Sequence, residues 1–113
     1  MLGDNNVTRR REPNLLVTRT DTAVEHLEQA LQLAAEGRQG ASMSKFQSAL
    51  RLGLNIDISV LAAQVELPAS AFLALARAQT SSGALDAARA TLLHGVLVFP
   101  QERLLRLALS QLR

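Results

Sequence analysis

The fold of this chain is decided by the stretch "SSGALDAARATLLHGVLVFP", residues 81–100. Its glycine, Gly83, is suited to end one helix, and Pro100 must end the next, because the residue before a proline is pushed out of the helical region. Between these two stops, the small residues Ala88 and Gly95 stand seven positions apart and so lie on one face of a helix. Small side chains let helix axes approach, whereas bulky ones hold them apart. We therefore predict a helix that packs tightly against its neighbours at these two positions.

Two further helices are predicted upstream of this stretch. Thr22 and Glu25 have the spacing of a capping box, in which each side chain bonds a free backbone amide at a helix start. The helix that begins there should end at Gly37, and a second helix should stop near Gly53, so that the two form a hairpin. The apolar residues of the first helix recur at helical spacing; they are Val24, Leu27, Leu31 and Ala34.

Three other segments carry helix signals. Asp57 can cap a short helix from Ile58 to Glu66, and Pro68 suits the first turn of the helix that follows. After Pro100, the segment "ERLLRLALSQLR", residues 102–113, is amphipathic. The chain is therefore expected to form five to six short helices.

The composition favours one all-helical domain. The chain has 113 residues, enough for a single core, and 48% of them are hydrophobic. Alanine and leucine, both strong helix formers, supply most of this apolar content, and β-branched residues seldom occur in runs. We expect an all-α fold of stacked antiparallel helical hairpins over residues 21–113, preceded by a basic arm at residues 1–20.

The charge of the chain is concentrated in this arm. Residues 1–20 contain four arginines (Arg9, Arg10, Arg11 and Arg19) against Asp4 and Glu12, a net charge of +2 that equals the net charge of the whole chain. The arm has the twin arginines of an export signal but no apolar stretch of sufficient length after them. No apolar run approaches the 18 residues of a membrane span, and there are no cysteines. We expect a cytoplasmic protein with no membrane partner.

Residues 70–103 resemble a tetratricopeptide repeat, a helical hairpin of 34 residues that stacks into solenoids. The matching positions are Phe72, Leu75, Ala76, Gly83, Ala88, Leu92, Gly95 and Pro100. Gln79 departs from the pattern, because the repeat usually has an aromatic residue late in its first helix. A weaker copy lies 46 residues upstream, at Gly37, Ser42, Phe46, Ala49 and Leu50.

The resemblance implies a protein-binding module. Members of this family hold a peptide or a helix in a concave groove lined by the first helix of each hairpin. Carried onto this chain, the partner-binding positions are Val24, Leu27, Leu31, Ser70, Leu73, Arg77 and Ser81. This lining is mostly apolar, with one arginine, and suits an amphipathic helix or an extended segment of a partner protein. The implied function is a small chaperone, an adaptor or a sequestering regulator, for example a secretion chaperone or an anti-activator of a transcription factor.

The residues offer little support for an enzyme. His26 and His94 are the only histidines, and neither has the spacing of a metal-ligand motif. Carboxylates are scattered along the predicted helix surfaces, and no nucleophile motif is present. We therefore expect no catalytic residues, no metal and no cofactor.

DNA binding is the alternative function. Residues 61–77, "LAAQVELPASAFLALAR", resemble the helix-turn-helix of bacterial regulators. Glu66 stands where that motif has its turn glycine, and only Ser70 among the first residues of the would-be recognition helix could read a base edge. Nucleic acid is for these reasons not the expected partner.

The last predicted helix has more leucines than one face can bury. It contains five leucines: Leu104, Leu105, Leu107, Leu109 and Leu112. We expect Leu104 and Ala108 to pack on the preceding helix. Leu105, Leu109 and Leu112 would then form the interface of a homodimer or of an obligate complex with another protein.

Overall fold

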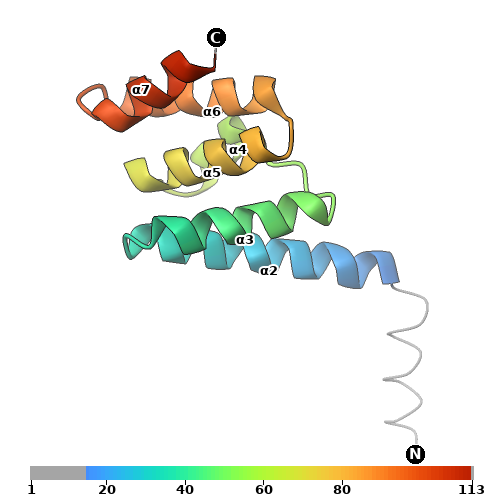
Figure 1. Ribbon diagram of the computed structural model, residues 1–113. Helices are drawn as coiled ribbons and strands as arrows, with labels where there is room; N and C mark the ends of the chain where they lie inside the picture. The colour runs from blue at the N-terminus through green and yellow to red at the C-terminus, as the bar shows by residue number, and fades with distance from the viewer. Residues whose placement is uncertain (1–14, 113) are drawn as a thin grey trace, which may run out of the picture.

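The computed structural model describes residues 15–112, with side chains from Asp21 onward. Over this range the chain forms six α-helices and no β-strand, so the predicted all-α fold is confirmed (Figure 1). The helices are α2 (Leu15–Ala35), α3 (Gln39–Arg51), α4 (Ile58–Gln64), α5 (Ala69–Ser81), α6 (Leu85–Val98) and α7 (Arg103–Gln111).

The helices are stacked in layers from one end of the molecule to the other. Helices α2 and α3 form one antiparallel hairpin, and α5 and α6 form a second. The two hairpins meet mainly through α3 and α5, while α7 covers α5 and α6 at the far end of the stack (Figure 1). The short helix α4 lies between the hairpins in sequence and packs against α6.

Two glycines close the hairpins in the same way. Gly37 and Gly83 have positive φ angles of 82° and 84°, in the left-handed region that residues with a side chain rarely adopt. At the second turn the amide of Gly83 donates to the carbonyl of Thr80, and the amide of Ala84 donates to the carbonyl of Gln79. These bonds satisfy the last carbonyls of α5, and both predicted helix ends are confirmed.

The predicted start of the first helix was wrong. Helix α2 begins at Leu15, seven residues before Thr22, so the capping-box residues lie inside a continuous helix. No glycine or proline stands between Leu15 and Thr22, and nothing therefore interrupts the helix upstream of the predicted cap. The predicted basic arm thus ends before residue 15, and its remaining residues, 1–14, lie outside the described part of the chain.

Helix α5 forms the centre of the core. Eight of its 13 residues are buried: Ala71, Phe72, Leu73, Ala74, Leu75, Ala76, Ala78 and Gln79. The helix packs against α2, α3, α6 and α7, and its buried residues therefore cover most of the helix circumference rather than one stripe.

The close approach predicted at Gly95 is confirmed. A Cβ atom added at this position would lie 3.0 Å from the Cβ and Cγ atoms of Phe72 and 3.2 Å from the Cδ1 atom of Leu105. Ala88, the other small residue of the face, is fully buried. Gly95 therefore allows α6 to lie against α5 and α7 at the same point.

A buried polar cluster explains why Gln79 stands where the repeat pattern usually has an aromatic residue. The Gln79 amide nitrogen donates to the Ile56 carbonyl at 3.3 Å, and its carbonyl oxygen accepts from the Thr91 hydroxyl at 2.7 Å. Both Gln79 and Thr91 are buried. Because a buried amide is costly unless it is hydrogen-bonded, this cluster ties the connection before α4 to α5 and α6 in one arrangement.

Candidate functional site

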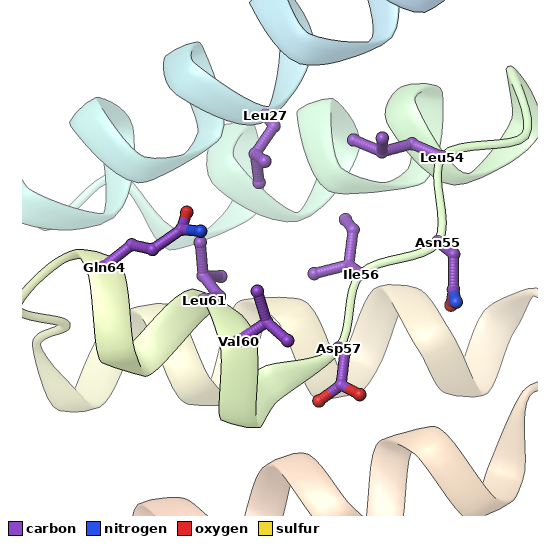
Figure 2. Close-up of a pocket in the computed structure, with 8 residues that line it drawn as sticks. All are labelled: Leu27, Leu54, Asn55, Ile56, Asp57, Val60, Leu61 and Gln64. Carbon is purple, nitrogen blue, oxygen red and sulfur yellow. The ribbon is translucent and has the colours of Figure 1, made fainter.

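An apolar hollow lies between α2, the connection after α3 and α4 (Figure 2). Its volume is about 340 Å³, within the range of ligand-binding clefts. Leu27 reaches into it from α2, and the side chains of α4 and of the connection face Leu27 from the other side (Figure 2). The lining residues are Leu27, Leu54, Asn55, Ile56, Asp57, Val60, Leu61 and Gln64.

The local sequence explains why α4 forms beside this hollow. The Asp57 carboxylate accepts a hydrogen bond from the Ser59 amide at 2.8 Å, and the Asp57 carbonyl accepts from the Leu61 amide at 2.9 Å. Asp57 is thus the N-cap of α4, as predicted, and the helix runs from Ile58 to Gln64. Because Ile58 and Leu61 are buried on its inner side, α4 is held in place while Val60 remains 55% exposed.

The chemistry of the hollow suits apolar side chains. Its walls are leucine, isoleucine and valine side chains, and polar groups are confined to Asn55, Asp57 and Gln64. In Figure 2 the side chains of Asn55 and Asp57 point away from the apolar walls. No group of three His, Cys, Asp or Glu residues that could hold a metal ion occurs among the described residues. The hollow can therefore take up aliphatic groups by burial.

The first hairpin places its three predicted binding residues differently. Leu27 lines the hollow, and Val24, one turn earlier on α2, is exposed. Leu31 is partly buried and packs against the core. Sequence reasoning missed Leu54, Ile56 and Val60, which lie outside the two hairpins. For Leu54 and Ile56 the signal was the presence of apolar residues in a connection that Gly53 and the Asp57 cap delimit, whereas Val60 belongs to the helix that Asp57 caps.

The second hairpin does not extend the same groove. Leu73 is only 3% exposed, so its prediction as a binding residue was wrong. The Ser70 hydroxyl donates to the Ala34 carbonyl at 2.8 Å and joins the two hairpins. Arg77 and Ser81 line a separate hollow of about 310 Å³. The other residues around it are Met43, Ala76, Thr80, Leu92, Ala108, Gln111 and Leu112.

The two hollows have no lining residue in common, so the single groove that was predicted is divided. The reason is the burial of α5. A helix surrounded by four neighbours directs most of its side chains into the core, and few of them remain to form a continuous groove with α2.

The predicted interface on the last helix was assigned to the wrong face. Leu105 is 1% exposed, and Leu109 and Leu112 pack against the core, whereas Leu104 and Leu107 are exposed. Leu105, Leu109 and Leu112 are spaced by four and three residues and therefore share one helix face, the face that α7 buries. Ala108 also packs against the core, as predicted, but Leu104 does not.

The far end of the stack exposes most of the large apolar side chains. Nine large hydrophobic residues are exposed among the described side chains, and six of them belong to α6 or α7. These six are Leu85, Leu93, Leu97, Val98, Leu104 and Leu107. Most of the large apolar side chains that are exposed in the described range therefore belong to α6 and α7, the helices farthest from α2 in the stack.

The two histidines lie on different helices, and the helix predicted to recognise DNA is largely buried. The ring of His94 stacks on Phe72 at a centroid distance of 5.7 Å, and His26 lies on a different helix, α2. The helix that would enter a DNA groove, α5, is the most buried helix of the described chain. A recognition helix must present its side chains to base edges, and α5 has only a few exposed side chains, Arg77 among them. This geometry argues against DNA binding by residues 61–77.

Comparison with known proteins gives no further guidance. No protein family, no curated protein and no solved structure matches this chain. None of the helices in the described range is long and apolar enough to cross a membrane.

Proposed function

We propose that this chain is a protein-binding module that holds the apolar side chains of a partner segment in the hollow between α2 and α4. The observation that carries the proposal is the exposed Val60 above an apolar wall, on a helix that Asp57 caps and Ile58 anchors. A preformed apolar hollow binds aliphatic groups with little reorganisation, which is the usual way in which anchor residues of a peptide are held.

The partner segment would be an amphipathic helix or an extended segment. About 340 Å³ of space accommodates one or two large aliphatic side chains, and a segment with apolar residues one helical turn apart provides them. A small chaperone, an adaptor and a sequestering regulator all work by holding such a segment. The resemblance of residues 70–103 to a tetratricopeptide repeat also supports a place for the chain in this class.

Affinity purification with matched variants tests this function. Wild-type protein, Val60→Glu and Ala63→Glu are used as baits in lysate of the cells that naturally produce the chain, and captured proteins are quantified by mass spectrometry. Both substitutions add one negative charge to an exposed position of α4, but only Val60 lines the hollow. A partner should be retained by wild type and by Ala63→Glu and lost with Val60→Glu. If no captured protein distinguishes the two variants, the hollow is not the binding site.

A further inference from the structure

The segments that build the hollow between α2 and α4 carry only acidic charges. In the part of α2 whose side chains are described, residues 21–35, the carboxylates are Asp21, Glu25 and Glu28, and there is no lysine or arginine. The connection and helix on the other side, residues 52–66, contain Asp57 and Glu66 and again no basic residue. The surroundings of the hollow are therefore negative, although the net charge of the whole chain is +2.

The helical register of α2 places two of these carboxylates beside the opening of the hollow. Val24 is three residues before Leu27 and lies on the same side of α2. Asp21 and Glu28 are three residues before and four residues after Val24, so they border the row that leads to Leu27. Both carboxylates are exposed. Arg19, the one basic residue in the sequence of α2, precedes Leu27 by eight residues, about 12 Å along the helix axis.

The carboxylates at the opening are not neutralised by ion pairs within the described part of the chain. The ion pair recorded there joins Arg89 to Asp86, both on α6. On the far side of the hollow, the Asp57 carboxylate accepts a hydrogen bond from the Ser59 amide and points away from the apolar walls (Figure 2). An apolar hollow with negative charges of this kind around it attracts a ligand that combines an apolar surface with cations.

We propose that the hollow takes up a basic amphipathic helix of a partner protein. The aliphatic side chains of that helix enter the hollow, and its lysines or arginines meet the carboxylates of Asp21, Glu28 and Asp57. An acidic partner helix would bring like charges to the same three groups and would be repelled. This inference rests on the proposed function and adds the chemistry of the partner.

The fold favours a helical partner over an extended one. An extended segment is commonly held by main-chain hydrogen bonds to the edge of a sheet, and residues 15–112 form no strand. Of the polar residues that line the hollow, Asn55 and Asp57 point away from its walls (Figure 2). Few groups are thus left to bond an extended backbone. A helix satisfies most of its own backbone groups and has to supply only an apolar stripe.

Fluorescence anisotropy with three synthetic peptides of about 18 residues tests the proposal on the full chain. The first peptide has leucines at helical spacing among lysines, and the second has glutamates in place of the lysines. The third has the composition of the first, with its leucines scattered around the helix. The first peptide should bind at least about tenfold more tightly than the other two, because each exposed ion pair contributes up to about fivefold. Its affinity should fall between about 50 mM and 500 mM salt.

A matched pair of charge variants tests the role of the carboxylates. Asp21→Lys/Glu28→Lys reverses the charges at the opening, and Glu36→Lys/Glu102→Lys makes the same change of net charge at exposed positions that do not line the hollow. Affinity for the lysine peptide should fall about tenfold in the first variant and stay within about twofold in the second. Circular dichroism establishes that both variants are folded, as expected for substitutions at exposed positions.

A second pair of variants tests whether the peptide enters the hollow. Val60→Ser removes part of the apolar wall without adding charge and should weaken binding of the lysine peptide about fivefold. Ala63→Ser, at an exposed position of α4 that does not line the hollow, should leave binding unchanged.

Three results would overturn the basic partner helix. The first is that none of the peptides binds. The second is that the lysine and glutamate peptides bind equally well and both lose affinity in Val60→Ser; the proposed function then stands, but charge does not select the partner. The third is that binding of the lysine peptide depends on Asp21 and Glu28 but not on Val60, which places the peptide on the surface of α2 instead of in the hollow.

Discussion

Substitution of Gly95 tests the packing on which the whole stack depends. In the structure the Cβ atom of an alanine at this position would stand 3.0 Å from the Cβ and Cγ atoms of Phe72. Those atoms are close to the backbone of α5 and cannot swing away, whereas the Cδ1 atom of Leu105, at 3.2 Å, lies at the end of a flexible side chain. The added atom must therefore push α6 and α5 apart.

Two opposing effects set the magnitude. Replacing a mid-helix glycine by alanine favours the helix by about 1 kcal/mol, because the unfolded chain loses less entropy on folding. Overpacking a closed contact costs about 1–3 kcal/mol. We expect Gly95→Ala to lower the free energy of unfolding by about 0–2 kcal/mol. Gly95→Leu adds three more heavy atoms to the same contact and should lower it by about 1–3 kcal/mol.

Thermal and urea unfolding, followed by circular dichroism, measure this effect. In a domain of this size 1 kcal/mol corresponds to a shift of about 4–8 °C in the midpoint. Gly40→Ala is the matched control, since Gly40 lies in α3 and a Cβ atom there would meet nothing within 4 Å. The control should be neutral or stabilising by at most about 1 kcal/mol. An unchanged midpoint for Gly95→Leu, or a Gly95→Ala variant that is stabilised by about 1 kcal/mol, would refute the close contact.

The other predictions concern stability at three places. Thr91→Val keeps the shape of the side chain but leaves the Gln79 oxygen without its buried donor, and should cost about 1–3 kcal/mol; in a double-mutant cycle with Gln79→Leu, purely additive losses would contradict the coupling. Asp57→Ala removes the cap of α4 and should cost about 0.5–2 kcal/mol, while Asp57→Asn, which can still accept the bond, should cost less. Leu105→Glu buries an unpaired charge and should prevent folding, whereas Leu104→Glu should change the unfolding free energy by no more than about 0.5 kcal/mol. If the two substitutions had comparable effects, the assignment of Leu105 to the core face of α7 would be wrong.

Several features follow from the sequence alone because their causes are local. Gly37 and Gly83 end helices, and Asp57 begins one, through bonds to groups a few residues away. The same reasoning was wrong at Thr22, where the expected cap lies inside α2. A side chain can cap a helix only where the helix begins, and α2 begins at Leu15 and continues without a break through Thr22.

Which side chains face the core was decided by the tertiary structure. The all-helical class and the small residue at position 95 could be predicted, since periodicity and side-chain volume are properties of the sequence. The four leucines of α7 and its C-cap Leu112, however, permit two overlapping apolar faces, and the sequence does not choose between them. The Cδ1 atom of Leu105 lies only 3.2 Å from the point where a Cβ atom at position 95 would stand, so Gly95 lets Leu105 pack closely against α6. That contact between two helices sets the rotation of α7, and it thereby buries Leu105 and leaves Leu104 and Leu107 exposed.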